Sequence, residues 1–120
     1  MERPRTILLV EDDEAVRNLL NHALEMHGYQ VLLAPNGERA LESARSWTGE
    51  IDLVLSDVVL PDISGVEVAR RLEQARPGVK VLLMSGYAQD LVAPGQAWDF
   101  IAKPFLLRNL LRRVEELVAR

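Results

Sequence analysis

Short apolar segments alternate along the chain with stretches in which apolar residues recur at the three-to-four-residue spacing of a helix. The apolar segments are rich in β-branched residues and occupy residues 6–10, 31–34, 51–55, 79–84 and 100–102. Each has about the length of a buried strand. Strands that are buried on both faces and alternate with helices predict a parallel sheet with helices on both sides. The pattern therefore indicates an α/β three-layer sandwich.

Polar residues mark the ends of the intervening helices. Asp13 and Asn36 stand where the first and second helices need an N-cap, and Gly28 stands at the C-terminal cap of the first. Ser64 and Glu67 have the spacing of a capping box at the start of the third helix. The last helix has no polar N-cap, and its apolar positions are Leu107, Leu110, Leu111, Val114, Leu117 and Val118.

The connection between the fourth and fifth strands is the least regular part of the pattern. Pro94 and Gly95 would stop any helix that begins near Ala88. We therefore expect a helix of at most two turns in this connection.

The composition describes one globular domain, and residues 5–119 form one unit of the pattern. The chain has 120 residues, with 14 Lys and Arg against 18 Asp and Glu, so its formal net charge is −4. This balance argues against a nucleic-acid-binding face. The absence of cysteine excludes thiolate catalysis and cysteine-based metal centres. No apolar run approaches the ~20 residues that cross a bilayer, and no signal-peptide core follows the N-terminus, so we expect a cytoplasmic protein without membrane insertion.

Polar residues follow four of the five predicted strands, at the edge of the sheet where α/β proteins bind ligands. They are Glu11, Asp12 and Asp13 after the first strand, Ser56 and Asp57 after the third, Ser85 and Gly86 after the fourth, and Lys103 and Pro104 after the fifth. We expect these carboxylates, a hydroxyl and an ammonium to converge.

Glu11, Asp12 and Asp57 would repel one another unless a cation neutralised them, and a set of oxygen ligands suits Mg²⁺. Without a thiol or a well-placed imidazole, the nucleophile must be a carboxylate or a hydroxyl. Asp57 at the centre of the set can attack phosphorus. Lys103 and Mg²⁺ would then offset the charge of the phosphoryl oxygens, and Ser85 could donate a hydrogen bond to one of them.

Some of these residues also have a simpler interpretation. Taken alone, Asp57 is typical of a helix cap or a turn, and Ser85 with Gly86 is typical of a turn. Lys103 stands out because the chain has only two lysines, the other being Lys80. The occurrence of these residues together, each after a predicted strand, favours a functional site over separate caps and turns.

The aromatic residues and the two histidines have alternatives as well. Trp47 and Trp98 mark either partner surfaces or packing against the sheet edges. His22 and His27 belong to the first helix and are given no role in phosphotransfer.

The sequence resembles the receiver domain of two-component response regulators over essentially its whole length, so residues 1–120 are interpreted as a single receiver domain. The matching segments are Leu8 to Arg17 (LLVEDDEAVR), Asp57 to Pro61 (DVVLP) with Gly65 and Glu67, Met84 to Ala88 (MSGYA), and Lys103 to Phe105 (KPF). The segments MSGYA and FIAKPF look most like receivers attached to hybrid sensor histidine kinases.

The resemblance implies a flavodoxin-like fold with strand order 2-1-3-4-5 and about five helices. It implies that Asp57 is the phosphoacceptor and that Glu11, Asp12 and Asp57 bind Mg²⁺ together with the backbone carbonyl of Val59. It also implies that Lys103 contacts the phosphoryl group, that Ser85 and Phe100 form a switch, and that the peptide bond before Pro104 is cis.

The resemblance further implies partners. A histidine kinase or a histidine phosphotransfer protein would supply the phosphoryl group, and an unknown effector would read the output, with a homodimer left open. The stretch from Ser85 to Lys103 is about one helical turn shorter than in related domains, so the fourth helix is expected to be shortened. That helix belongs to the surface that most receivers use for output.

The sequence favours a phosphorylation-dependent regulator that is not a turnover enzyme over three other functions. A small phosphatase with an aspartyl-phosphate intermediate would place two aspartates, separated by one residue, after the first strand, and Glu11, Asp12 and Asp13 do not provide this. A phosphate-independent interaction module would not need the complete acidic set. Flavin binding would need a phosphate-binding loop where the chain has three negative charges.

Overall fold

The computed structural model describes residues 3–86 and 98–119. The elements, in chain order, are β1 (Thr6–Val10), α1 (Glu14–Met26), β2 (Gln30–Ala34), α2 (Gly37–Ser46), β3 (Leu53–Asp57), α3 (Gly65–Ala75), β4 (Lys80–Ser85), β5 (Asp99–Ala102) and α4 (Leu107–Ala119). The shortened helix expected near 88–94 and Tyr87 of the MSGYA segment lie outside the described residues.

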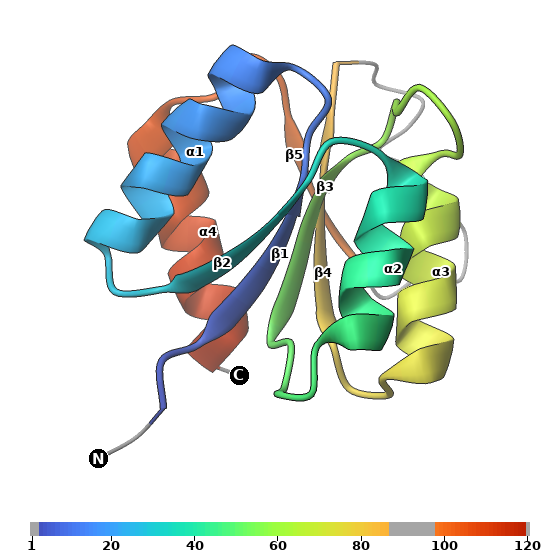
Figure 1. Cartoon of the computed structure of the whole chain (residues 1–120). Coiled ribbons are helices and arrows are strands. Elements are labelled where there is room, and N and C mark those ends of the chain that lie inside the picture. Colours follow the sequence, from blue (N-terminus) through green and yellow to red (C-terminus); the bar gives the residue numbers. More distant parts are fainter. Residues whose placement is uncertain (1–2, 87–97, 120) are drawn as a thin grey trace.

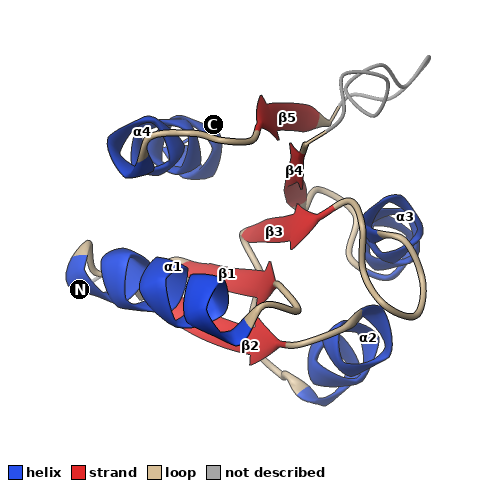
Figure 2. Ribbon diagram, turned by 90° about the horizontal axis from the view of Figure 1, so that it is seen from above, coloured by secondary structure: helices blue, strands red, loops and turns tan. Residues whose placement is uncertain are grey.

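The five strands form one parallel sheet in the order β2-β1-β3-β4-β5. Helices α1 and α4 cover one face of the sheet, and α2 and α3 cover the other (Figures 1 and 2). The expected three layers and the expected strand order are thereby confirmed.

Each central strand contributes side chains to both faces of the sheet. In β1, Ile7 and Leu9 pack with α1 and α4, whereas Leu8 and Val10 pack with α2 and α3. All four are completely buried. This alternation explains why the four residues of β1 after Thr6 are all apolar, because neither face of the strand meets water.

The predicted N-caps form. Asp13 accepts from the Val16 amide at 3.1 Å, Asn36 from Arg39 at 2.8 Å and Ser64 from Glu67 at 3.1 Å. The capping box at Ser64 is only half made, because the Glu67 carboxylate pairs with Arg70 and Arg71 instead.

The C-terminal end of α1 is also as predicted. Gly28 has a φ of +86°, and the amide of Tyr29 donates to the Leu24 carbonyl at 3.2 Å. The Gly28 amide donates to the Glu25 carbonyl at 3.0 Å. These two bonds make a Schellman motif, which needs a residue that tolerates positive φ.

The two tryptophans both pack against the core of the protein. Trp98 is 8% exposed and donates from Nε1 to Glu73 at 3.1 Å. Trp47 is half-buried against the α2/α3 side of the core, and its Nε1 donates to the Glu50 carbonyl at 3.1 Å. Packing is therefore observed for both rings, and Trp47 remains partly exposed.

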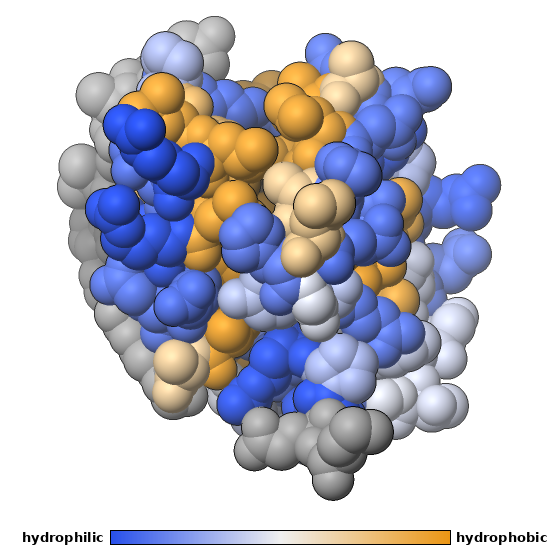
Figure 3. All heavy atoms as spheres, turned by 90° about the vertical axis from the view of Figure 1, so that its left-hand side faces the viewer, coloured by the Kyte–Doolittle hydropathy of each residue, from blue (hydrophilic) through white to orange (hydrophobic). Residues whose placement is uncertain are grey.

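The side of the molecule that carries α1 and α4 has an apolar band on its surface (Figure 3). Large exposed apolar side chains on these segments are Leu19 and Met26 of α1 and Leu106 immediately before α4. The Leu106 carbonyl accepts from the amides of Asn109 and Leu110, so an apolar residue occupies the N-cap position of α4 as expected. Among the described residues, no helix is long and apolar enough to cross a membrane.

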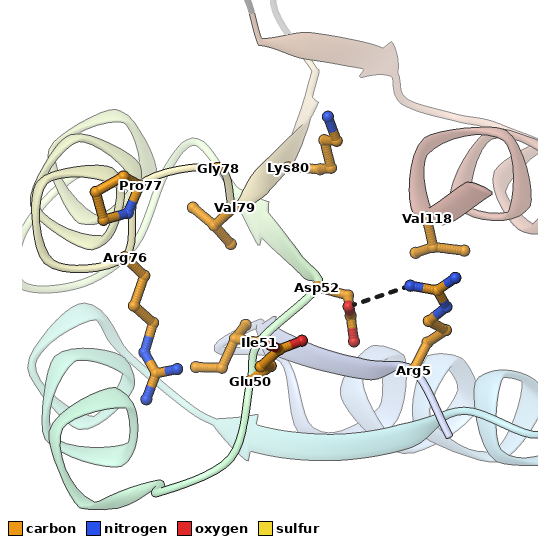
Figure 4. Close-up of a pocket in the computed structure, with 10 residues that line it drawn as sticks. All are labelled: Arg5, Glu50, Ile51, Asp52, Arg76, Pro77, Gly78, Val79, Lys80 and Val118. Carbon is orange, nitrogen blue, oxygen red and sulfur yellow. Dashed lines mark ion pairs between the residues drawn. The ribbon is translucent and has the colours of Figure 1, made fainter. Parts of the chain in front are cut away.

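A polar pocket of about 290 Å³ lies at the amino-terminal ends of β1, β3 and β4, and Asp52 is one of the residues that line it (Figure 4). The Asp52 carboxylate accepts from the Thr6 amide at 2.7 Å and pairs with Arg3 at 2.9 Å and Arg5 at 3.6 Å. Burial alone would raise the pKa of Asp52, but the hydrogen bonds and charges of these partners outweigh it and hold the pKa below its usual value.

We expect Asp52→Asn to lower the free energy of unfolding by about 1 kcal/mol at neutral pH. Because the pKa of Asp52 is lower in the folded than in the unfolded state, the ionised carboxylate stabilises the fold above about pH 4. This contribution is lost as the pH falls through the folded-state pKa. Urea denaturation at neutral and strongly acidic pH checks this, with the exposed Glu42→Gln as control. An equal difference between wild type and Asp52→Asn at both pH values would contradict it.

Candidate functional site

The parallel register brings the predicted site residues to one edge of the sheet. Val10 pairs with Ser56, Asp57 with Met84, and Ser85 with Ala102. Glu11 and Lys103 each follow one of these paired positions directly. The loops after β1, β3, β4 and β5 therefore start side by side, which is why the sequence positions converge.

The acidic residues form one cluster. Glu11, Asp12 and Asp57 each place a carboxylate oxygen within 4.8 Å of the others. Glu11 is 1% exposed and Asp57 is 8% exposed, whereas Asp12 is exposed. Two of the three charges thus lie in a region that water hardly reaches.

Glu11 has one satisfied and one unsatisfied oxygen. Its Oε2 accepts from the Asp13 amide at 3.1 Å. Its Oε1 is buried and accepts no hydrogen bond from any residue that the structure describes, and the Lys103 ammonium lies 3.7 Å from it. Burial raises the pKa of Glu11 to about 6, and the charge of Asp57 and the hydrogen bond with Asp12 act in the same direction. The Asp13 amide and Lys103 only partly oppose this rise.

Within residues 3–86 and 98–119, Lys103 supplies the ammonium that pairs with the carboxylates of the site. Its Nζ donates to Asp57 Oδ2, and its side chain is 33% exposed. Burial works against the charged form, but the hydrogen bond and charge of Asp57 and the charge of Glu11 raise the pKa of Lys103. The ammonium therefore lies beside two of the three carboxylates, those of Glu11 and Asp57.

This set of atoms fits Mg²⁺. The ligand atoms are all oxygen, their charge exceeds what Lys103 neutralises, and Glu11 Oε1 is buried without a hydrogen bond. Val59 lies against the cluster, because its amide donates to Asp57 Oδ1 at 3.4 Å. Glu11, Asp12, Asp57 and the Val59 carbonyl are the groups that could hold the ion.

Ser85 and Phe100 occupy different environments. Ser85 ends β4, is 2% exposed, and its carbonyl accepts from the Lys103 amide at 2.7 Å. Phe100 is half-buried in β5 and packs with a third core cluster on the α3 side, which includes Val58. The peptide bond between Lys103 and Pro104 is cis.

Three further residues support the site, although the sequence pattern gives none of them a role of its own. The Arg17 guanidinium donates to the Glu11 carbonyl at 2.9 Å, and Ser56 Oγ donates to the Asp57 carbonyl at 2.9 Å. The Gly65 amide donates to the Val58 carbonyl at 2.7 Å. Gly65 was present in the matching segments, but its close approach to the backbone of β3 has no signal in the local pattern.

The family model of the response regulator receiver domain matches residues 7–115 of the sequence. The sensor kinase CckA of Brucella abortus is 41% identical over an alignment of 119 residues, which covers 96% of this chain and 13% of that protein. The response regulator receiver protein CpdR of the same organism is 37% identical over 95% of this chain and 97% of that protein. The chain belongs to the family of response regulator receiver domains.

Solved structures agree with this assignment. The receiver domain of the hybrid histidine kinase CckA superposes with a TM-score of 0.83 at 34% identity, covering 94% of this chain and 98% of that one. The response regulator TrrA of Thermotoga maritima, in complex with Mg²⁺-BeF, gives a TM-score of 0.82 at 33% identity over 94% of this chain and 98% of that one. The expected similarity to a hybrid-kinase receiver is thereby confirmed.

We expect Lys103→Met to bind Mg²⁺ about three- to tenfold more tightly than the wild type, because the ammonium that competes for the carboxylates is gone. Isothermal titration calorimetry with Mg²⁺ measures this. Lys80→Met is the matched control, since Lys80 is the only other lysine and starts β4 at the opposite edge of the sheet. Unchanged or weaker binding by Lys103→Met would mean that the ammonium does not compete with the metal.

Proposed function

We propose that residues 1–120 act as a single receiver domain that accepts a phosphoryl group on Asp57 in a Mg²⁺-dependent reaction. The donor is a phosphohistidine of a histidine kinase or of a histidine phosphotransfer protein. The observation that carries the proposal is the position of Asp57, buried beside Glu11 and Asp12 and hydrogen-bonded by Lys103.

In the proposed reaction, a carboxylate oxygen of Asp57 attacks phosphorus and forms a new P–O bond. The P–N bond to the donor imidazole breaks, and its electron pair stays on the ring nitrogen. Bound Mg²⁺ supplies positive charge that offsets the charge of the phosphoryl oxygens. Lys103 holds the carboxylate before transfer and pairs with a phosphoryl oxygen afterwards.

Ser85 and Phe100 are the proposed switch. The Ser85 hydroxyl would donate to a phosphoryl oxygen on Asp57, and Phe100 would change its packing in β5 in response. The domain would then alter its affinity for an effector or for a second copy of itself. It is proposed to be a cytoplasmic regulatory module that catalyses only its own phosphorylation and dephosphorylation.

Intact-protein mass spectrometry tests the proposal. The wild type is incubated with a small acyl phosphate, once with Mg²⁺ and once with a chelator of divalent ions. We expect the mass of one phosphoryl group to be added only in the presence of Mg²⁺. Absence of the adduct in folded protein, or equal labelling without metal, would contradict the proposed reaction.

A further inference from the structure

The loop of residues 58–64, which follows Asp57, is bonded to a distant helix end. Asp62 Oδ1 accepts from the Gly37 amide at 2.9 Å, and its Oδ2 accepts from the Glu38 amide at 2.8 Å. Both amides belong to the first turn of α2, where backbone donors have no partner within the helix. A carboxylate at this end is also favoured by the helix dipole.

The amides outweigh the effect of burial on Asp62. Burial would raise the pKa of Asp62, but hydrogen bonds from the backbone amides of Glu38 and Gly37 hold it below its usual value. Asp62 is therefore ionised at neutral pH and accepts both hydrogen bonds as a carboxylate.

An apolar contact reinforces this connection. A Cβ atom added to Gly37 would lie 2.4 Å from Cγ1 of Ile63 and 2.9 Å from Cγ2 of Val68. The side chain of Ile63 thus packs directly on the backbone of the first residue of α2. Helices α2 and α3 lie side by side on one face of the sheet, with this loop at their upper ends in Figure 1.

The other end of the loop belongs to the metal site. The Val58 amide donates to the Met84 carbonyl at 2.9 Å, and the Val59 amide donates to Asp57 Oδ1 at 3.4 Å. Leu60 is buried, and Pro61 restricts the backbone next to Asp62. Only three peptide bonds separate Val59 from Asp62, so the position of Asp62 restricts that of the Val59 carbonyl.

We propose that Asp62 is a positioning residue for the Mg²⁺ site, because it fixes the loop to α2 and so holds Val59 in place for the ion. This inference rests on the proposed function, since it assumes that Mg²⁺ binds at Asp57. A loop without this attachment adopts the binding geometry for only a fraction of the time, and the apparent affinity falls by that fraction. By thermodynamic reciprocity, bound Mg²⁺ strengthens the attachment to α2.

Calorimetric titration with Mg²⁺ tests the role of Asp62. We expect Asp62→Ala to weaken binding about three- to tenfold. Asn36→Ala is the first control, because it removes another N-terminal hydrogen bond of α2, to the Arg39 amide, without touching the loop. Glu38→Gln is the second, because it removes a negative charge at the same helix end while keeping its backbone amide. Both controls should bind Mg²⁺ within twofold of the wild type.

Hydrogen exchange of the wild type gives a readout that needs no variant. We expect Mg²⁺ to slow the exchange of the Gly37 and Glu38 amides relative to that of the Arg39 amide. Wild-type affinity in Asp62→Ala, an equal loss in either control, or unchanged exchange at both amides would overturn the inference and leave the proposed function standing. A wild type that binds no Mg²⁺ would overturn both.

Discussion

Asp57→Asn is expected to take up no phosphoryl group under conditions in which the wild type is fully labelled. The amide keeps the shape of the side chain but removes the anionic oxygen that attacks phosphorus. The fold should persist, because the variant also relieves repulsion with Glu11 and Asp12 while Lys103 keeps Glu11 as a neighbour. Intact mass after incubation with an acyl phosphate and Mg²⁺ measures the loss.

Asp52→Asn is the matched control for Asp57→Asn. Asp52 lies just before the same strand, at the opposite edge of the sheet, and its carboxylate is engaged by Thr6 and Arg3. The control should be labelled at the wild-type rate. If Asp57→Asn still gains one phosphoryl group at that rate, the acceptor is another residue, and Asp12 would be the first to examine.

Gly65→Ala is expected to lower the free energy of unfolding by about 3 kcal/mol and to weaken Mg²⁺ binding at the same time. A Cβ at Gly65 would lie 2.0 Å from the carbonyl oxygen of Asp57 and 2.9 Å from its carbonyl carbon. Both atoms are backbone in a buried strand, so neither can turn away as a side chain would. Either α3 or the end of β3 must move, and the end of β3 carries Asp57.

Urea denaturation and calorimetric Mg²⁺ titration of Gly65→Ala measure the two effects. Gly86→Ala is the control, because Gly86 follows β4 at the same edge of the sheet and an added Cβ there meets no atom of the described residues within 4 Å. We expect its stability to change by less than about 1 kcal/mol. Wild-type stability of Gly65→Ala would show that the contact between α3 and β3 can relax without cost.

The hydrophobic pattern predicts which segments form strands but not where each strand begins and ends. The third strand was predicted at residues 51–55, but β3 runs from Leu53 to Asp57 and so begins and ends two residues later. Ile51 is buried at 6% exposure but precedes the first paired residue. Ser56 and Asp57 are paired although they are polar. A run of apolar residues indicates which positions are buried. The bounds of a strand depend instead on its hydrogen bonds to neighbouring strands that are distant in sequence.

The helix ends show the same division. Asp13, Asn36 and Gly28 were predictable, because each acts within its own helix end. The missing contact of Glu67 in the capping box was not predictable, because nearby arginines pair with its carboxylate. Asp62 accepts a hydrogen bond from the first residue of a helix that begins 25 residues before it. A local sequence pattern does not predict a hydrogen bond between residues this far apart.

The sequence by itself determined the fold class, the strand order through the family resemblance, and the approach of Glu11, Asp57, Ser85 and Lys103. It could do so because strand and helix periodicity is local, and because the carboxyl ends of parallel strands meet at one edge.

Only the tertiary structure decided the environment of those groups: the buried Glu11 oxygen that accepts no hydrogen bond, the backbone contact at Gly65, and the attachment of the loop to α2 through Asp62. These features arise between segments that are distant in sequence, so their energies depend on burial and distance, which exist only once the chain has folded.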